Sequence, residues 1–458
     1  MKILILGAGR VGTSVAENLV SEHNDITVID TDGPRLALLQ ERFDLRVVVG
    51  SGIHMSTLEQ AGARDADMLI SCATADETNL VACKIAKQVF NVPRRIARVR
   101  SPEFLDNASL MGDDGFCVDN LICPERSVTS YLTNLIAIPE ALQVVEFAEG
   151  RVSAVTVRAH AGSPLCQHPI ESLREHMPGA DIRIISIFRQ GELITPEGRT
   201  VIQPGDEVVC LAATHEVRRL VRELRERDKP VRRLMIAGGG NIGLRLAREI
   251  GHLYEVKLIE QNRRRCEYLA AQVPSKTLVL NGDATDEDLL EDENVGDMDL
   301  FLALTSDDED NIMSSLLAKR MGARRVIALI GRKSYAELME GGRIDIAISP
   351  SEATIGELLR HVRRGDVVAV HRLRHGVTEA IEAIAHGDAK SSKVVGRRIE
   401  QIKLPDGAII GAIARSDAVL MAHHDTVVQS GDHVIVFVTH QRLVSQVEKL
   451  FQVSVSFF

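Results

Sequence analysis

Two glycine-rich segments are the residues of this chain best suited to chemistry. One is Gly7, Ala8, Gly9, Arg10, Val11 and Gly12, after an apolar run at 3–6; the other is Gly238, Gly239, Gly240, Asn241, Ile242 and Gly243, after an apolar run at 234–237. In a strand-turn-helix unit the first glycine makes a tight turn. The second lets backbone amides approach a pyrophosphate, and the third lets the helix pack closely on the strand. Each segment therefore predicts a nucleotide-phosphate site.

A carboxylate follows each glycine segment at nearly the same distance. Asp30 comes 23 residues after Gly7, and Glu260 comes 22 residues after Gly238, each at the end of a second apolar run. Such an acid accepts hydrogen bonds from ribose hydroxyls and disfavours a 2′-phosphate. The pattern favours NAD(H), ADP or ATP over NADP and does not separate NADH from ADP or ATP. One isolated match is as often only a tight turn, whereas two at a fixed interval are hard to produce by chance.

Further candidate ligands come from the predicted strand ends of the first half. In an open parallel sheet, ligands bind beyond the carboxyl ends of the strands, where Ala73 and Thr74 should lie. Arg98 and Arg100 are two residues apart on or near a predicted strand at 95–99, so they should face the same side. They could clamp terminal phosphate oxygens, and a pair of arginines on a solvated strand end is an equally weighted alternative.

The second half differs at these positions. An aliphatic residue, Leu329 or Ile330, stands where the first half has Arg98, and only Arg332 is available to match Arg100. We therefore expect the first pocket to tolerate more negative charge than the second.

Asp283 is a candidate found only in the second half. It follows Gly282, at the position where the first half has Ser51. Its carboxylate suits a ribose or adenine contact, or else the N-cap of the helix before Leu289.

The two halves stay parallel beyond these motifs, which indicates a domain duplication. Thr74 followed by 76–79 matches Thr305 followed by 308–311, with one inserted residue. Strands alternate with helices of 10 to 15 residues in both halves. The predicted fold class is α/β, with two tandem Rossmann-like, doubly wound parallel-sheet domains, each followed by a small α/β domain.

Each Rossmann-like segment leads through an amphipathic helix into a smaller segment. The helices follow Pro124 and Pro350, and turns at 203–208 and 429–434 predict matching hairpins. The charged stretch 222–233 suits a boundary between halves. The predicted parts are 1–124 (first Rossmann domain), 125–143 (helix), 144–228 (first small domain), 229–350 (second Rossmann domain), 351–367 (helix) and 368–453 (second small domain).

Composition excludes several functional classes. The 458 residues carry a formal net charge of -10 and no Trp, with 3% aromatic residues, which argues against nucleic-acid partners and base-stacking platforms. The sequence contains no run of 18 apolar residues, so it predicts no membrane-spanning helix. The first predicted strand begins at Lys2 or Ile3, leaving no room for a signal peptide before it. Seven cysteines without a CxxC pair suit a reducing cytoplasm, with thiols as core residues.

No catalytic constellation is evident. His371 and His375 have the spacing of helical metal ligands, but their surroundings predict a strand and no further ligand, so no metal site is expected. The acidic run 307–310 suits a charged loop better than an acid/base pair. An NAD-dependent oxidoreductase with one degenerate Rossmann half remains an alternative, although no Lys, His or Tyr proton donor accompanies a substrate domain. A scaffold without ligand binding is a third possibility, which the intact acids and glycines oppose.

Taken together, these residues resemble the TrkA family over essentially the whole chain. Its members are cytoplasmic regulatory subunits of bacterial Trk potassium-uptake systems, built from tandem RCK domains. The strongest local marks are 7–12, Asp30, 98–102 and 238–243.

The resemblance implies a non-enzymatic subunit that forms a ring, expected to be a tetramer, beneath a membrane-embedded potassium channel or transporter. It implies that the protein is peripheral on the cytoplasmic face of the inner membrane and gates potassium uptake when nucleotides bind. It also implies that 7–11, Asp30, Thr74 and Arg98 hold nucleotide in the first half. In the second half, 238–242, Glu260 and Asp283 would do so. The helices after Pro124 and Pro350 would be crossover elements, and the small domains effector or assembly modules.

Overall fold

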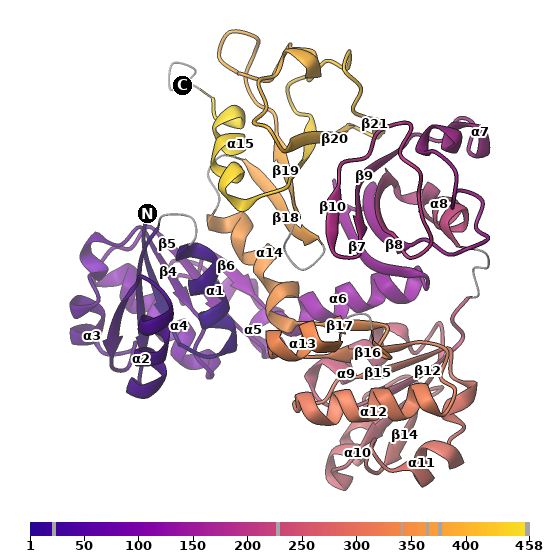
Figure 1. Ribbon diagram of the computed structural model, residues 1–458. Coiled ribbons are helices and arrows are strands. Elements are labelled where there is room, and N and C mark those ends of the chain that lie inside the picture. The colour runs from indigo at the N-terminus through magenta and orange to yellow at the C-terminus, as the bar shows by residue number, and fades with distance from the viewer. Residues whose placement is uncertain (21–23, 226–229, 340–341, 363–365, 374–377, 454–458) are drawn as a thin grey trace. The chain divides into compact units, whose positions relative to one another are not determined.

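A computed structural model of the protein describes residues 1–20, 24–225, 230–339, 342–362, 366–373 and 378–453 (Figure 1). The strands form four sheets, two of six parallel strands and two of five antiparallel strands. The chain divides into two compact units. Unit 1 comprises Met1–Val128 and Pro350–His361, and unit 2 comprises Thr129–Ser349 and Val362–Phe458.

The first parallel sheet has the strand order β3-β2-β1-β4-β5-β6. Its strands are β1 (Lys2–Leu6), β2 (Asp25–Asp30), β3 (Arg46–Val49), β4 (Met68–Ser71), β5 (Arg94–Arg98) and β6 (Asn120–Ile122), and its helices are α1 (Arg10–Val20), α2 (Gly33–Arg42), α3 (Met55–Gln60), α4 (Asp76–Gln88) and α5 (Pro102–Leu105). The strand order reverses between β1 and β4, the point at which doubly wound sheets bind ligands.

The second parallel sheet repeats this order as β14-β13-β12-β15-β16-β17. Its strands are β12 (Arg233–Ala237), β13 (Glu255–Glu260), β14 (Leu278–Asn281), β15 (Leu300–Ala303), β16 (Val326–Leu329) and β17 (Ile346–Ile348), and its helices are α9 (Asn241–Ile250), α10 (Arg263–Ala270), α11 (Glu287–Asp292), α12 (Asp308–Arg320) and α13 (Lys333–Met339). The predicted fold class, with two tandem doubly wound domains, is confirmed.

Near-continuous apolar strands explain why both sheets are covered on their two faces. In β1, Ile3, Leu4, Ile5 and Leu6 are all buried, as are all four residues of β15. Runs of this kind are typical of parallel strands that have helices on both sides. All seven cysteines are also buried, as free thiols.

The two amphipathic helices that follow the sheets are α6 (Pro124–Ala137) and α14 (Pro350–Val362). Most residues of their predicted apolar faces are buried: Val128, Leu132, Leu135 and Ile136 in α6, and Ile355, Leu358, Leu359 and Val362 in α14. Tyr131, also on the predicted face of α6, is only half-buried. α14 follows the second sheet in the chain yet belongs to unit 1, while α6 from Thr129 onward belongs to unit 2. The helices are therefore exchanged between the halves.

Hydrogen bonds support this exchange in unit 1. The Ser127 hydroxyl donates to the Glu357 carboxylate at 2.7 Å, and the Arg94 guanidinium donates to the carbonyl oxygen of His361 at 3.2 Å. The start of α6 is thus bonded to the middle of α14, and the last turn of α14 is bonded to β5 of the first Rossmann domain.

The two small domains contain antiparallel sheets ordered β10-β9-β11-β8-β7 and β18-β19-β22-β20-β21. The first has β7 (Ala141–Phe147), β8 (Val152–Arg158), β9 (Ile182–Arg189), β10 (Glu192–Ile194), β11 (Glu207–Ala213), α7 (Leu173–His176) and α8 (Val217–Leu224), and the second has β18 (Val367–Leu373), β19 (Thr378–Ile384), β20 (Ala408–Arg415), β21 (Ala418–Met421), β22 (His433–Val438) and α15 (Val444–Phe451). One buried cluster includes Phe147 and Leu211 of the first domain with Phe437 and Ala412 of the second. The two domains therefore share a core.

The hairpin prediction for 203–208 and 429–434 was wrong. The segments are tight turns with Gly205 and Gly431 at positive φ, but β11 pairs with β8 and β9, and β22 pairs with β19 and β20. Each turn is fixed by a buried carboxylate. Asp206 accepts two hydrogen bonds from Arg189, at 2.9 and 2.8 Å, and Asp432 accepts two from Arg415, at 2.8 and 2.7 Å. The sequence repeat marks a repeated ion pair rather than a repeated hairpin.

No helix in the described part of the chain combines the length and the apolar character needed to cross a membrane.

The shared core predicts a pH-dependent stability through His371. Its ring packs edge-on against Phe147 with centroids 5.0 Å apart, and burial lowers the pKa of His371 to about 4. An unfolded histidine has its ordinary pKa of 6.5, so the unfolded chain binds more protons than the folded chain between pH 6.5 and 4. The free energy of unfolding should therefore fall as pH decreases through this window.

Chemical denaturation of the full chain at pH 7 and pH 5 tests this. His371→Phe keeps an aromatic ring and removes the titration, so it should lose less stability than the wild type. His215→Gln, at a histidine whose side chain is 79% exposed, should behave like the wild type. An equal pH effect in wild type and His371→Phe would contradict the prediction.

Candidate functional site

The first glycine segment forms a tight turn between β1 and α1. Gly7 has φ of +100°, and a Cβ there would lie 2.9 Å from the backbone nitrogen of Ala73 at the end of β4. A Cβ on Gly12 would lie 1.8 Å from the carbonyl oxygen of Gly7. A Cβ on Gly9 would meet no described atom within 4 Å. Gly7 and Gly12 are thus required for packing, while Gly9 leaves open space where a ligand can approach the backbone.

The second glycine segment repeats this geometry. Gly238 has φ of +108°, with a notional Cβ 2.9 Å from the backbone of Leu304, and a Cβ on Gly243 would lie 2.0 Å from the carbonyl oxygen of Gly238. A Cβ on Gly240, like one on Gly9, would meet no atom of the described residues within 4 Å. The helices α1 and α9 begin at Arg10 and Asn241, so Val11 and Ile242 lie in their first turns. The backbone N–H groups at the start of a helix have no acceptor within the helix, which suits such a turn to an anion.

The two acids lie beside the glycine turns. Asp30 accepts hydrogen bonds from the backbone nitrogens of Ala8, at 2.5 Å, and Asp32, at 2.9 Å. Glu260 accepts from Gly239 at 3.0 Å and from Asn262 at 2.8 Å. Each carboxylate oxygen keeps a second acceptor position, so the acids can bind ribose hydroxyls while they hold the loop.

A buried asparagine aligns the strand ends in each half. Asn79 Oδ1 accepts from the backbone nitrogen of Ala73 at 2.8 Å, and its Nδ2 donates to the carbonyl oxygen of Arg98 at 2.8 Å. In the second half, Asn311 Oδ1 accepts from the nitrogen of Thr305 at 2.9 Å and its Nδ2 donates to the carbonyl oxygen of Leu329 at 2.8 Å.

These hydrogen bonds correct the sequence alignment. Ala73 and Asn79 are six residues apart, as are Thr305 and Asn311, so Thr305 corresponds to Ala73 and the predicted inserted residue was wrong. The same bonds resolve the position left open between Leu329 and Ile330, because Leu329 occupies the place of Arg98.

An aspartate next to each asparagine holds the following loop. Asp76 accepts from the backbone nitrogens of Arg100, at 2.9 Å, and Ser101, at 2.8 Å. Asp308 accepts from Gly331 and Arg332, both at 2.9 Å. Arg100 therefore corresponds to Gly331, and the suggested match with Arg332 was wrong. Arg332 instead contacts Glu309 at 2.6 Å and the Tyr335 hydroxyl at 2.8 Å.

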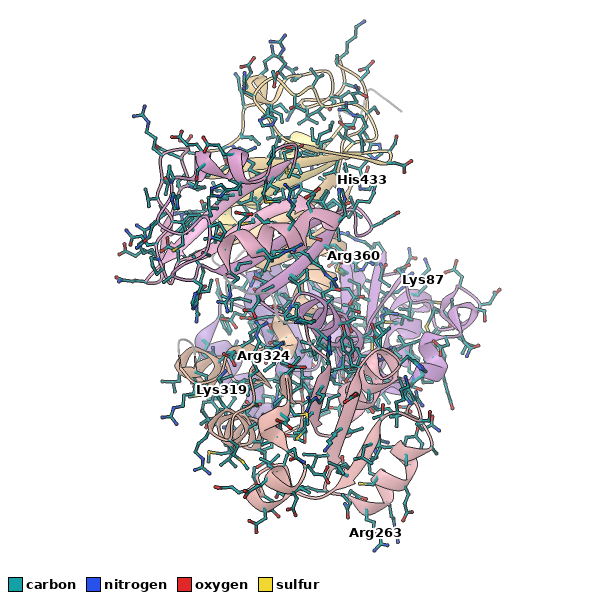
Figure 2. All side chains as sticks on the ribbon, turned by 90° about the vertical axis from the view of Figure 1, so that its right-hand side faces the viewer. Lys87, Arg263, Lys319, Arg324, Arg360 and His433 are labelled. Carbon is teal, nitrogen blue, oxygen red and sulfur yellow. The ribbon has the colours of Figure 1, made fainter. Side chains whose placement is uncertain are left out.

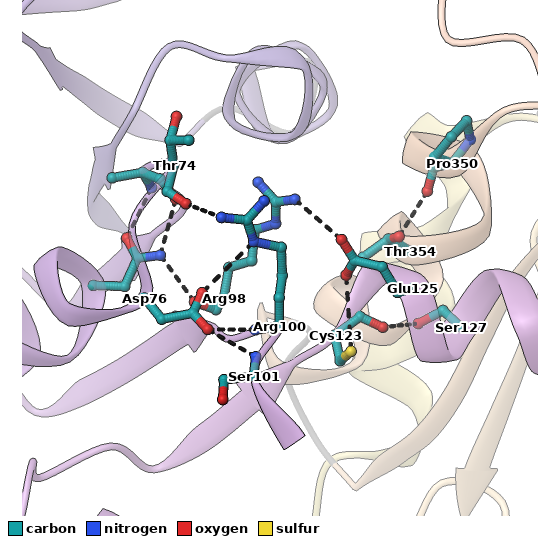
Figure 3. A network of polar contacts seen from close by, with 12 residues as sticks. Thr74, Asp76, Arg98, Arg100, Ser101, Cys123, Glu125, Ser127, Pro350 and Thr354 are labelled. Carbon is teal, nitrogen blue, oxygen red and sulfur yellow. Dashed lines mark hydrogen bonds and ion pairs between the residues drawn. The ribbon is translucent and has the colours of Figure 1, made fainter. Parts of the chain in front are cut away.

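Arg98 and Arg100 are held by different partners (Figure 3). The Arg100 guanidinium donates to the carbonyl oxygen of Thr74 and lies 3.7 Å from Asp76. Arg98 approaches Glu125, in the first turn of α6, at 3.7 Å, and the two side chains are only 18% and 15% exposed. Buried Nε of Arg98 has no hydrogen-bond partner among the described residues. Arg98 is thus a loosely paired cation at the carboxyl-terminal edge of the first sheet.

The second half lacks both members of this ion pair. Leu329 replaces Arg98, and the pairing of β16 with β17 places Ser351 at the position of Glu125. Arg265 brings a positive charge to the second glycine turn, where its Nε donates to the carbonyl oxygen of Gly239 at 3.0 Å. The two edges share one backbone design and differ in charge.

Asp283 lies on an exposed turn of the second half. Hydrogen bonds from the Thr285 backbone, at 2.8 Å, and hydroxyl, at 2.7 Å, hold the pKa of Asp283 below its usual value. The N-cap alternative was wrong, because Asp286 caps α11 by accepting from Asp288 and Leu289. Asp283 is therefore a charged carboxylate on the surface of this turn.

Sequence reasoning missed the roles of Asp76, Asn79 and Glu125 and of their counterparts. The repeated Asp-x-x-Asn spacing was a usable signal for the first two, since a polar pair at a strand end often satisfies loop amides. Glu125 had no such signal. Of the two histidines considered as metal ligands, His371 lies in β18 and His375 lies outside the described residues. No group of three potential ligands suited to a metal is present among the described side chains.

Family models match both halves of the chain. The TrkA-N domain matches residues 3–124 and 234–350, and the TrkA-C domain matches residues 154–225 and 389–452. The chain therefore belongs to the TrkA family. It is 53% identical over 455 residues to the Trk system potassium uptake protein TrkA of Vibrio alginolyticus, with 99% of each chain covered. It is 52% identical to the protein of that name from Halomonas elongata, with 100% of each covered.

Solved structures share the fold at low identity. The GsuK RCK domain superposes with a TM-score of 0.61 at 19% identity, covering 98% of this chain and 94% of that one. The GsuK channel bound to NAD superposes with a TM-score of 0.60 at 18% identity, covering 98% of this chain and 79% of that one. The chain therefore has the tandem RCK fold.

The glycine geometry predicts a separation of folding from binding. Gly9→Ala adds a methyl group to open space, so it should leave the free energy of unfolding nearly unchanged and weaken nucleotide binding in the first half by about tenfold or more, because the pyrophosphate must approach this backbone. Gly12→Ala drives a methyl group into the Gly7 carbonyl and should destabilise the fold by about 1–3 kcal/mol or more. Denaturant unfolding and calorimetric titration with ADP measure both effects. Equal destabilisation by the two variants would be inconsistent with this geometry.

Proposed function

We propose that the protein is a nucleotide-binding regulatory subunit of a potassium-uptake system. The observation that carries the proposal is the duplicated glycine turn with open space at Gly9 and Gly240, each beside an acid that can accept ribose hydroxyls. The names of the relatives place them in Trk potassium uptake, and one structure of the same fold is of a channel bound to NAD. NAD(H), ADP and ATP are the proposed ligands.

The proposed binding residues are those predicted from the sequence. Gly7 to Gly12, Asp30, Ala73, Thr74, Arg98 and Arg100 serve the first half, and Gly238 to Gly243, Glu260 and Asp283 serve the second. All lie at or beside the carboxyl ends of the parallel strands. The charge difference suggests a division of labour in which the first half accepts the additional phosphate of ATP and the second prefers NAD(H).

Arg98 links phosphate binding to α6. A terminal phosphate carries more charge than the Glu125 carboxylate and forms bidentate contacts with a guanidinium. Binding would draw Arg98 from Glu125, whose carboxylate would then remain near the N-terminus of α6, where negative charge is favourable. Because the rest of α6 belongs to unit 2, this exchange is a route from the first pocket to the remainder of the chain.

The regulatory role also involves assembly. We propose a ring of subunits, expected to be a tetramer, peripheral on the cytoplasmic face of the inner membrane and bound to a membrane-embedded potassium channel or transporter. The predicted division at 124, 143, 228, 350, 367 and 453 supplies the modules: two nucleotide sensors, two exchanged helices and two small domains that share a core. Several pockets on one ring multiply a small difference in affinity between two ring shapes.

A second candidate, an NAD-dependent oxidoreductase, is favoured only by the glycine segments. Sustained NADH oxidation with any of a panel of small carbonyl compounds, abolished by Asp30→Ala or Glu260→Ala, would favour it over the non-enzymatic regulator.

Calorimetric titration with NADH, NAD, ADP and ATP is the direct test of two unlike pockets. Arg98→Leu should weaken ATP binding by about 10-fold to 100-fold through the lost charged hydrogen bonds and leave NADH binding little changed. Glu260→Ala should remove a separate class of sites. If the wild type binds none of these nucleotides, the proposed input to regulation is absent.

The Arg98–Glu125 pair gives a sharper prediction. Glu125→Gln removes the intramolecular competitor and should tighten ATP binding about fivefold, the equivalent of a partly exposed ion pair of about 1 kcal/mol. Glu357→Gln is the matched control, because Glu357 contacts Arg126 and Ser127 rather than Arg98. Weaker ATP binding by Glu125→Gln would show that Glu125 supports the phosphate site instead of competing with it.

Potassium uptake in cells lacking the endogenous subunit tests the biological role. Expression of the wild-type chain should restore uptake at low external potassium, and the Gly9→Ala, Gly240→Ala double variant should not. Unchanged uptake on deletion of the protein would contradict the proposal.

A further inference from the structure

A second cavity lies at the edge of the second Rossmann sheet opposite the glycine turn. It has a volume of about 170 Å³. Its walls come from the end of α6, the first small domain and the amino-terminal ends of β12, β15 and β16. The lining residues are Leu135, Pro139, Glu140, Leu142, Arg158, Arg225, Val231, Asp299, Leu300, Arg324, Arg325, Ile327 and Asp345. All of them belong to unit 2, and none is a proposed nucleotide contact.

Three of the four arginines in this cavity have a carboxylate partner. Arg225 pairs with Glu140, and Arg324 pairs with Asp299 at 2.9 Å. Arg158 pairs with Glu207, which is outside the lining, at 2.8 Å.

The remaining acid of the lining, Asp345, is occupied elsewhere. It accepts from Lys319 Nζ at 2.7 Å and from the backbone nitrogen of Val326 at 2.7 Å. Lys319 also donates to the carbonyl oxygen of Arg324 at 2.8 Å, and both side chains are labelled in Figure 2. Asp345 is therefore committed to the strand edge.

Arg325 is left without a carboxylate in contact. Its guanidinium donates to the carbonyl oxygen of Ala141, and within the described chain no acid lies at ion-pair distance from it. Loss of hydration lowers the pKa of Arg325 to about 10. A buried guanidinium with unused N–H donors destabilises the fold through lost hydration unless an anion binds beside it.

The first half does not repeat this arrangement. Arg94 is the register counterpart of Arg325, because Arg95 pairs with Leu69 as Val326 pairs with Phe301. Arg94 donates to the carbonyl oxygen of His361. The corresponding sheet edge is lined by three acids, Asp25, Asp65 and Asp67, with Met1, Lys2 and Asn24. The cluster of arginines at this sheet edge is thus found in the second half and not in the corresponding cavity of the first.

We propose that this cavity binds a small oxyanion of the phosphate class, with Arg325 as its principal donor. Arg158 and Arg225 also line the cavity and add positive charge to its wall. The volume is below the roughly 300 Å³ at which pockets for drug-sized ligands begin, so the cavity fits phosphate or a small organic phosphate and excludes a dinucleotide. Leu142 and Ile327 offer apolar walls for a short carbon chain.

The ligand would join three parts of unit 2. Ala141, at the start of β7, connects α6 to the first small domain, and Arg325 precedes β16 of the second Rossmann sheet. An anion between them adds charged hydrogen bonds across this contact and stabilises one arrangement of helix and sheet. The site is therefore an input separate from the two nucleotide pockets.

Titration of the full chain with inorganic phosphate tests the site, at constant ionic strength with chloride replaced. Isothermal calorimetry should give saturable binding to the wild type. Arg325→Met, which keeps the aliphatic stem, should weaken it by about tenfold or more, in line with the loss of charged hydrogen bonds. Arg199→Met, at an exposed arginine outside this cavity, should bind phosphate as the wild type does. A second titration in the presence of saturating ADP excludes phosphate held at the nucleotide pockets.

A chemical measurement keeps the test independent of how Arg325→Met folds. Phenylglyoxal modifies arginine side chains, and mass spectrometry locates the adducts on the wild-type chain. Phosphate should protect Arg325 and leave exposed Arg263 unprotected. The proposal is overturned if the wild type shows no saturable phosphate binding, or if Arg325→Met binds phosphate as tightly as the wild type does. It is also overturned if phosphate does not protect Arg325 of the wild type from phenylglyoxal.

Discussion

The buried asparagine at the central strand ends is the contact on which both candidate nucleotide sites depend. The Asn79 amide connects the loop after β4 with the end of β5 through four hydrogen bonds, and Asn311 does the same for β15 and β16. A buried amide is stable only when its donors and acceptor are satisfied, so the strand ends must keep this spacing. The glycine turn packs against one of these loops, which places turn, acid and strand ends around one edge.

On this common backbone, the two halves have diverged in charge. The Ser71 hydroxyl donates a hydrogen bond to Asn79, and the Thr305 hydroxyl donates the equivalent hydrogen bond to Asn311. The same contact is therefore made in both halves by different residues. The ion pair of Arg98 and Glu125 has no such replacement, since Leu329 and Ser351 stand in its place. The opposite sheet edges diverge in the other direction, with arginines in the second half and aspartates in the first. The two Rossmann domains thus share their backbone contacts and differ in the charged residues at both edges of their sheets.

The exchanged helices and the shared core of the small domains connect the two halves of the chain. α14 packs on the first Rossmann domain, most of α6 belongs to unit 2, and the small domains share the cluster around Phe147 and Phe437. Arg98 of the first candidate pocket contacts Glu125 in the first turn of α6, and Arg325 lines a cavity together with residues at the end of that helix. Packed helices of this kind move as units, because close-packed interiors do not deform continuously.

The sequence by itself determined the duplicated doubly wound fold, the glycine turns, the acids and the amphipathic helices, because these depend on local periodicity and on backbone geometry that few residues satisfy. It did not determine register. The apparent insertion near Thr305 and the match of Arg332 with Arg100 were corrected by the hydrogen bonds of Asn311 and Asp308, and the hairpins at 203–208 and 429–434 were corrected by the strand pairing. Tertiary structure alone decided the pairing of Arg98 with Glu125 and the isolation of Arg325. Those relations join residues from separate elements, and the interactions of a side chain depend on which neighbours the packing brings within a few ångströms.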